Sequence, residues 1–305
     1  MTTPERPPTT LDRIARAVRI GVPGRPTPAG ERFVRLVAPL ARLLFRPALE
    51  GLERLPVGRP FLLVANHSGM GICEIAALAV LWVGRAGDDE APARRVPLTG
   101  LAHPLGFVVP GAGAFLRNAG AIPSTYEHAG QALEGGASVL VFPGGDHEAM
   151  RPLWQARRVD FHGRAGFARL ARRAGVPVVP LGIRGSHVTV PILWRSALLP
   201  LLLVLPRLAG LKRLPLTIPW LVGTALFAWG LRDTPGWAAL AVYLWWWFPL
   251  VYFLPLVPSR ITFHLGAPLE PGELFPTPGP SAEDAAARRI EAEVQALVDP
   301  GRPKG

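Results

Sequence analysis

The segment VANHSGMGICE, residues 64–74, is a polar stretch between two apolar runs, and it places His67 seven residues before Glu74. A histidine beside a carboxylate can serve as a general base, with the carboxylate fixing the tautomer of the imidazole. In one continuous helix the two residues would share a face but lie about 10.5 Å apart along the axis. They can meet only if the chain turns between them, and Gly69 and Gly71 permit such a turn.

The same pattern also fits a turn without catalytic function. In that interpretation His67 bonds to the backbone, and Glu74 is a first-turn residue of the following helix, where the helix dipole favours a carboxylate. Nucleophilic hydrolase chemistry is disfavoured, because no Gly-x-Ser-x-Gly pattern surrounds Ser68 and because Cys73 lies in an apolar run. The residues alone therefore leave an acid–base pair and a structural turn as alternatives.

The elements that must position this segment alternate between strand and helix. The predicted elements are strands at 60–65, 138–142, 176–183 and 261–265, and helices at 74–83, 166–173 and 281–298. The strand at 138–142 is closed by the turn residues Pro143-Gly144-Gly145. This alternation predicts an α/β fold in which a sheet is flanked by helices.

The composition points to a lipid environment. Hydrophobic residues make up 49% of the 305 residues and charged residues 18%, and the mean hydropathy is +0.26, which is high for an ordinary soluble enzyme. The formal net charge of +11 favours anionic partners such as a phospholipid surface. Nucleic acid is not expected as a partner, because no zinc-finger spacing or aromatic RNA-binding pattern occurs. The single cysteine excludes an intrachain disulfide and suggests a reducing compartment.

Two long uncharged runs interrupt the second half of the chain. They cover residues 214–231 and 234–259, which are 18 and 26 residues, both long enough for a membrane span. Two spanning helices joined by a turn at 232–236 are one prediction; an insertion in the plane of the membrane and a buried subdomain are the alternatives. Lys212, Arg213 and Arg260 flank the outer ends of the pair, which favours the cytoplasmic face for the rest of the chain.

The N-terminal region is rich in proline and glycine and lacks the apolar core of a signal peptide. Residues 32–52 form a basic and apolar segment that fits either an interfacial helix or a helix packed on the domain, with Pro39 and Pro47 expected to break it. Four regions are predicted: 1–54, an N-terminal arm with an amphipathic or interfacial helix; 55–190, the core; 191–258, an apolar membrane-associated insertion; and 259–305, a return strand with a C-terminal helix.

Several motifs together resemble the phospholipid/glycerol acyltransferase superfamily, over residues 55–190 and more weakly over 259–270. They are Asn66-His67 after an apolar strand, Phe142-Pro143-Gly144-Gly145 with Glu148, Arg164 with Gly166-Phe167, and Pro177 with Pro180. The common form of the first motif has Asp five residues after His, where this chain has Ile72. The chain is more similar to the monoacylglycerol/diacylglycerol acyltransferase-like branch, whose acid comes seven residues after His. It departs from that branch in having Glu74 instead of Asp and Met70 instead of Gly.

The resemblance implies a glycerolipid acyltransferase-like sheet and a transfer of a fatty acyl group to a glycerolipid-type hydroxyl. Acyl-CoA or acyl-carrier protein would be the donor, membrane lipid a partner, and the location the cytoplasmic face of a membrane, as in a bacterial inner membrane. His67 would be the general base and Glu74 the residue that orients it. The residues that the resemblance assigns to substrate binding are Asn66, Ser68, Gly69, Phe142, Pro143, Gly144, Gly145, Glu148 and Arg164.

No cofactor is implied, and no metal is proposed, because the remaining histidines show no spacing such as His-Glu-x-x-His. Members of the superfamily that recognise phosphate read Phe-Pro-Glu-Gly-Thr-Arg where this chain reads Phe-Pro-Gly-Gly-Asp-His. Loss of that arginine favours a neutral or bulky lipid acceptor, although Arg151 or Arg164 could supply a charge for a phosphate. The alternative function is a non-catalytic lipid-binding or scaffold protein with the same fold.

Overall fold

The computed structural model describes residues 10–18, 22–69, 71–84, 92, 96–108, 111–203, 213–246, 257–276 and 280–301. Within these ranges one seven-stranded sheet has the order β1-β9-β6-β2-β5-β3-β4. Its strands are β1 Ala48–Glu50, β2 Leu62–Ala65, β3 Leu98–Ala102, β4 Ile122–Pro123, β5 Ser138–Val141, β6 Val178–Arg184 and β9 Thr262–Leu265. The neighbouring pairs are parallel except β6 and β9, which run antiparallel.

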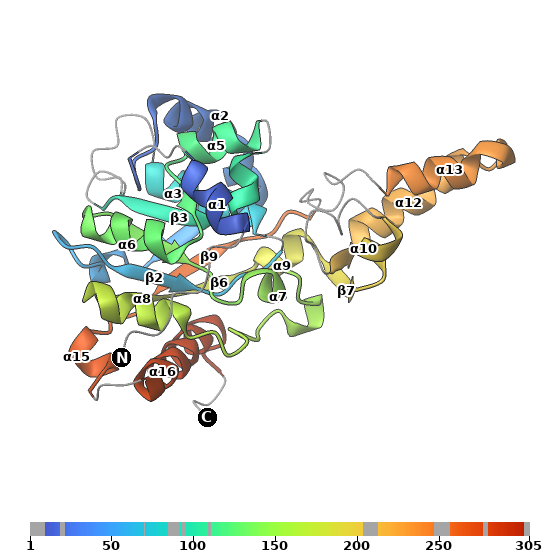
Figure 1. Ribbon diagram of the computed structural model, residues 1–305. Helices are drawn as coiled ribbons and strands as arrows, with labels where there is room; N and C mark the ends of the chain where they lie inside the picture. The colour runs from blue at the N-terminus through green and yellow to red at the C-terminus, as the bar shows by residue number, and fades with distance from the viewer. Residues whose placement is uncertain are drawn as a thin grey trace.

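Strand β2 lies at the centre of the sheet because all four of its residues are apolar and buried. Its side chains alternate between the two faces. Leu62 and Val64 join the core beneath the helices at 126–134, 166–174 and 280–298, whereas Leu63 and Ala65 join the core beneath the helices at 28–45 and 72–83. A strand covered on both faces is typical of a parallel sheet with helices on each side, and the α/β prediction is confirmed (Figure 1).

The helices of this body precede the first strand, connect the strands or follow the last of them. Those of eight or more residues in this body are α1 Thr10–Ala17, α2 Pro28–Phe45, α3 Ile72–Val83, α6 Tyr126–Glu134, α8 Gly166–Ala174 and α16 Pro280–Val298. The shorter ones are η1 Leu52–Arg54, η2 Pro104–Phe107, α5 Ala112–Asn118, α7 Gly145–Ala149, η3 Leu153–Gln155, α9 Ser186–Thr189 and α15 Pro271–Leu274.

Helix α2 corrects one prediction, because it continues through Pro39. Val34, Ala38, Ala41 and Phe45 bury one face of the helix in the core, and this packing offsets the backbone hydrogen bond that proline removes. The opposite face carries exposed apolar side chains: Phe33, Leu36, Leu40 and Leu43. The helix thus has a packed face, as one prediction expected, and an apolar face toward solvent.

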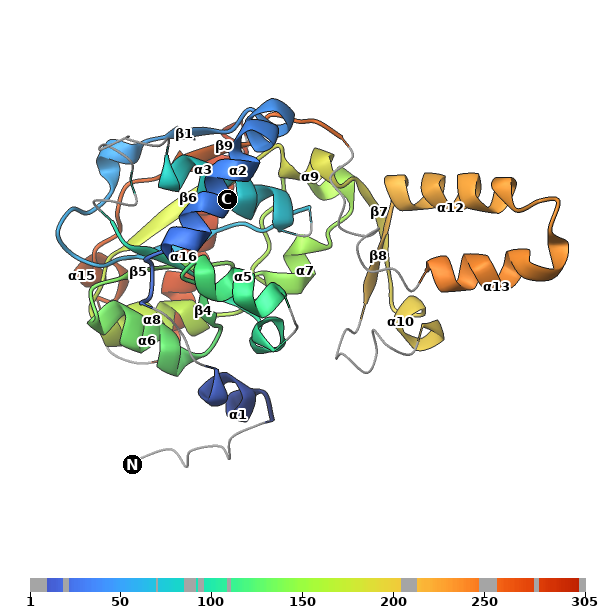
Figure 2. The same cartoon turned by 90° about the horizontal axis from the view of Figure 1, so that it is seen from above.

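The insertion forms an arm that extends away from the sheet (Figure 2). Its elements are β7 Ile192–Ser196, α10 Leu199–Leu202, β8 Leu214–Thr217, α12 Ile218–Gly230 and α13 Pro235–Trp245. Strands β7 and β8 pair antiparallel at its base, and α12 and α13 lie side by side beyond them.

The arm differs from the prediction of two membrane-spanning helices over its described residues, whereas residues 247–256 of the second run lie outside them. The first uncharged run divides into strand β8 and a helix of 13 residues, and the helix described in the second run has 11 residues. The prediction failed for the first run because the absence of charge and the high hydropathy indicate only that a segment is apolar. They do not show where a strand ends and a helix begins within it. In the part of the chain that the structure describes, none of the helices combines the length and the apolar character that a membrane crossing needs.

Candidate active site

The site lies where three neighbouring strands end. His67 follows β2, Phe142 follows β5 and Ser186 follows β6. Strand β2 is parallel to both of its neighbours, with Val64 opposite Val141 and Ala65 opposite Leu181. The three carboxyl ends therefore meet at one edge of the sheet, where ligands of open α/β sheets commonly bind.

A tight turn brings His67 and Glu74 together. Gly69 and Gly71 have φ angles of 51° and 80°, which glycine adopts without strain. Gly71 is also the N-cap of α3, so Glu74 lies in the first turn of that helix. A Cβ on Gly71 would collide with the imidazole ring of His67. The glycine thus serves two needs, because it turns the chain and lets the ring lie against the backbone.

The carboxylate of Glu74 bonds to both of the residues that begin the turn. Its Oε1 contacts Nδ1 of His67 and accepts the backbone N–H of Ser68 at 3.3 Å. Its Oε2 accepts the hydroxyl of Ser68 at 3.0 Å, and that hydroxyl is also hydrogen-bonded to Ser186. The Glu74 side chain is fully buried, whereas 15% of the His67 side chain is exposed. The carboxylate holds a proton on Nδ1, which leaves Nε2 with the lone pair that a general base needs.

The loop after β5 packs against the other side of His67. The ring of Phe142 stacks on the imidazole, with 4.3 Å between centroids and 22° between planes. Glu148, in α7, is buried beneath the same loop, and its Oε2 accepts the backbone N–H of His67 at 3.0 Å. Burial raises the pKa of Glu148 to about 7, against the opposing effect of the nearby Arg151 guanidinium. The catalytic candidate is therefore held through both its ring and its backbone.

The comparisons with known proteins agree with this geometry. The profile of the family described as Acyltransferase matches residues 46–184, which include β2, β5, β6 and the loops that form the site. This match supports the resemblance to the phospholipid/glycerol acyltransferase superfamily over residues 46–184.

The relatives described next are bacterial and plant proteins. An uncharacterized protein of Mycobacterium tuberculosis is 33% identical over 186 residues, which are 60% of this chain and 49% of that protein. The chain thus spans about half the length of this relative. Phytyl ester synthase 1 of Arabidopsis thaliana chloroplasts is 27% identical over 144 residues, 45% of this chain and 19% of that protein. The crystal structure of the 1-acyl-sn-glycerophosphate acyltransferase PlsC from Thermotoga maritima shares the fold, with a TM-score of 0.50 and 16% identity over 90% of this chain and 79% of that chain.

The acyltransferase domain uses several predicted substrate-binding residues for its own internal contacts. Asn66 is buried, and its amide group bonds to the backbone N–H and carbonyl of Ile183 at 2.7 and 2.9 Å. Ser68 bonds to Glu74, as described above, and Gly69 packs closely on the carbonyl of Ser186. All three residues are buried, and these contacts hold the loop that carries His67. Phe142 and Gly145 are the predicted residues near His67 that keep part of their surface accessible.

The two arginines singled out in the sequence differ in accessibility. Arg151 is buried, with 1% of its side chain exposed, and lies 3.4 Å from the carboxylate of Glu148. Arg164 is 45% exposed; its Nη1 donates to the carbonyl of Pro143 at 2.9 Å, and its Nη2 lies 3.5 Å from Asp146. Arg164 therefore fastens the glycine-rich loop while part of its side chain still faces solvent.

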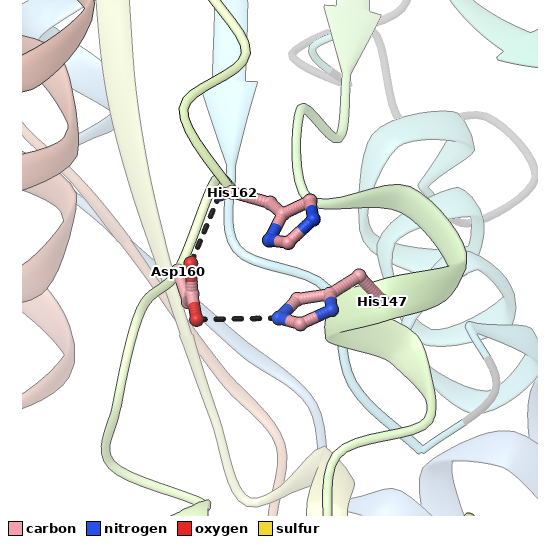
Figure 3. A group of neighbouring side chains, drawn as sticks. All are labelled: His147, Asp160 and His162. Atoms are coloured by element: carbon pink, nitrogen blue, oxygen red, sulfur yellow. Dashed lines mark hydrogen bonds and ion pairs between the residues drawn. The ribbon is translucent and has the colours of Figure 1, made fainter.

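A cluster of His147, Asp160 and His162 lies beside this loop, and the sequence spacing gave no sign of it (Figure 3). Asp160 lies 3.2 Å from Nε2 of His147 and accepts the backbone N–H of His162 at 2.9 Å, and the two imidazole rings stack with centroids 4.3 Å apart. These residue types can bind metals. However, Arg195 of β7 directs a guanidinium N–H at Nδ1 of His147 and donates to its carbonyl. Nε2 of His147 then carries the proton and donates it to Asp160, so these contacts occupy both ring nitrogens of His147 and link the arm to the loop.

The C-terminal helix contributes contacts that sequence patterns did not predict. Gln295 and Glu291 of α16 accept the backbone N–H groups of Val159 and Phe161, each at 2.8 Å. Asp160 lies between those two residues, and its own N–H donates to Glu148 at 3.2 Å. The helical periodicity of 281–298 predicted the helix, but it carried no signal for which polar side chains would face the site loop.

Proposed function

We propose that this chain is a membrane-associated acyltransferase that moves a fatty acyl group from acyl-CoA or acyl-carrier protein to a glycerolipid-type hydroxyl. His67 is the general base, and Glu74 orients it. One observation carries this function: the buried carboxylate of Glu74 contacts Nδ1 of His67, while the other ring nitrogen is left for chemistry at the partly exposed edge of the sheet. A structural turn would need neither a buried carboxylate on the imidazole nor an accessible ring.

The transfer needs one proton to move twice. Nε2 of His67 removes the proton of the acceptor hydroxyl as its oxygen attacks the thioester carbonyl. The tetrahedral intermediate then collapses, the carbon–sulfur bond breaks, and the imidazolium returns the proton to the leaving thiolate. Glu74 stabilises the imidazolium between these steps by its negative charge. The products are an ester and a free thiol.

No acyl-enzyme is part of this mechanism. Cys73 is buried, and burial raises the pKa of its thiol to about 11, so the thiolate that would attack a thioester is scarce at neutral pH. The hydroxyl of Ser68 is buried as well and bonds to Glu74 and Ser186. Neither side chain is placed as a nucleophile.

The acceptor is a neutral or bulky lipid alcohol. A buried phosphate needs a cationic partner, but Arg151 is enclosed with Glu148, and Arg164 has Asp146 and the Pro143 carbonyl as partners. The plant relatives are named for the synthesis of phytyl esters, which are esters of an uncharged long-chain alcohol. Both observations favour an acceptor without a phosphate next to the reacting hydroxyl.

The arm and helix α2 provide the contact with a lipid surface, with the rest of the chain on the cytoplasmic face. Helices α12 and α13 expose large apolar side chains, among them Leu226, Trp229, Trp237 and Leu244. The arm begins at β7, shortly after the end of β6, and therefore leaves the body near the edge that holds His67. Apolar helices lying in the membrane interface would bring a membrane-soluble acceptor to this edge.

The test is an acyl-transfer assay with purified protein, labelled acyl-CoA or acyl-carrier protein, and a lipid extract. We expect a new lipid ester, and we expect His67→Ala to lower its formation by about 100-fold or more with little change in Tm. His264→Ala is the matched control, because His264 also lies beside a carboxylate, with Nδ1 2.9 Å from Glu50, but on strand β9. Turnover of His67→Ala close to wild type would refute the catalytic assignment, and binding of lipid without any ester would favour a non-catalytic lipid-binding protein.

A further inference from the structure

A buried ion pair holds the backbone of His67 from both sides. Oε2 of Glu148 accepts the His67 N–H at 3.0 Å. Arg151 lies beside it, with Nη2 3.4 Å from the His67 carbonyl and 3.4 Å from Oε1 of Glu148. Both side chains are buried, at 0% and 1% exposure. A burial this complete separates the pair from solvent and from any substrate.

The loop after β5 is shaped to admit Glu148. Nε of Arg151 donates to the carbonyl of Glu148 at 3.3 Å, and Oε1 of Glu148 accepts the N–H of Asp160 at 3.2 Å. A Cβ on Gly144 would lie 2.8 Å from the carboxyl carbon of Glu148, so any larger residue would displace the carboxylate. Gly144 is the position at which the phosphate-recognising motif has Glu, and here the carboxylate of Glu148 fills that space instead.

We propose that Glu148 and Arg151 are positioning residues that fix the peptide of His67, and through it the imidazole, for acyl transfer. This inference rests on the proposed function, in which Nε2 of His67 removes the acceptor proton. His67 lies beyond the last residue of β2, where the sheet no longer holds the backbone. The ion pair replaces the missing strand contacts with one acceptor for the N–H and one donor for the carbonyl. Arg151 also offsets the cost of burying the carboxylate.

Single and double variants of Glu148 and Arg151 distinguish positioning of His67 from simple stabilisation of the fold. Glu148→Gln and Arg151→Met each leave one buried partner uncompensated and should lower Tm. The double variant carries neither buried charge, so its Tm should recover toward the wild-type value, since neutral replacements of a buried pair are often tolerated. The double variant still lacks the contacts of Glu148 and Arg151 with the backbone N–H and carbonyl of His67. We expect its kcat to stay about 10- to 100-fold below wild type, with KM for donor and acceptor changed by less than about threefold.

A second set of variants keeps the test decisive if a single variant does not fold. Gly144→Ala retains both charges but displaces the carboxylate, and it should lower kcat in the same way. Glu283→Gln is the matched control, because Glu283 also pairs with an arginine, Arg169 at 2.8 Å, but between α8 and α16; its kcat should stay at the wild-type value.

The pH profile gives an independent readout. Burial raises the pKa of Glu148 to about 7, with Arg151, the His67 and Asp160 N–H groups and the His67 side chain opposing this. Protonation of Glu148 as the pH falls through about 7 weakens the hold on His67. The kcat/KM of the wild type should therefore show an added decline of about 10- to 100-fold across this range, which the profile of the Glu148→Gln variant should lack.

Three outcomes would overturn the inference: recovery of kcat together with Tm in the double variant, wild-type kcat in a folded Gly144→Ala variant, or identical acid limbs in the two profiles. An inactive wild-type protein would instead refute the proposed function itself.

Discussion

Replacing Glu74 with Gln tests the catalytic pair by removing one charge at nearly constant shape. The carboxylate accepts from Nδ1 of His67 and from the backbone N–H and hydroxyl of Ser68. A glutamine can keep its oxygen on Nδ1 and direct its amide N–H at the Ser68 hydroxyl, which can turn its own hydrogen to Ser186. The imidazole then keeps its tautomer and position, and what is lost is the charge that stabilises the imidazolium.

The magnitude follows from the direct contact. When Oε1 touches Nδ1, the two charge centres lie about 4 Å apart, and at an effective dielectric constant of about 20 their attraction is about 4 kcal/mol. Divided by about 1.4 kcal/mol per tenfold, this predicts a loss of about 10³-fold in kcat/KM. The free energy of unfolding should change by about 1 kcal/mol or less, because the buried carboxylate also loses its desolvation cost. Glu74→Asp should lose less, since its charge remains while the oxygens withdraw by about 1.5 Å.

The assay measures kcat/KM for ester formation together with thermal unfolding. Glu50→Gln is the control, because Glu50 contacts His264 through the same pair of side-chain types away from the site. Activity of the Gln variant within about threefold of wild type would refute the orienting role. Glu74 would then be a first-turn helix residue whose charge serves only the helix dipole.

Two further predictions concern the arm and the cysteine. Trp229 and Trp237 are 65% and 71% exposed, so replacing both with Ser should lower binding to anionic phospholipid vesicles by about tenfold or more without lowering Tm; sedimentation with vesicles measures this, and unchanged binding would contradict the proposed lipid contact. Because burial raises the pKa of the Cys73 thiol to about 11, iodoacetamide at about pH 8 should label the native protein far more slowly than the denatured one. Mass spectrometry checks the labelling, and equal rates would show that the thiol is accessible.

The sequence predicted the local features of the site because they depend on neighbours in the chain. The apolar run before His67 required a buried strand, and the observed strand β2 falls within it. The distance of seven residues to Glu74 required a turn at the glycines, and both glycines have positive φ. The helix after them begins at Ile72, close to the predicted start. Short-range sterics and the burial of apolar side chains were enough for these conclusions.

The tertiary structure decided which distant residues meet at the site. Ser186 reaches Ser68, and Glu148 reaches the His67 N–H, only because β6 and β5 are the two neighbours of β2 in the sheet. The pattern of apolar residues predicts a strand but does not encode its neighbours, so Glu148 was assigned to substrate binding in the sequence although its carboxylate is buried. The division of the first uncharged run into β8 and α12 was hidden for a similar reason. Residues 214–217 form a strand because they pair with β7. Hydropathy measures how apolar a segment is, but it does not identify the segment with which it pairs.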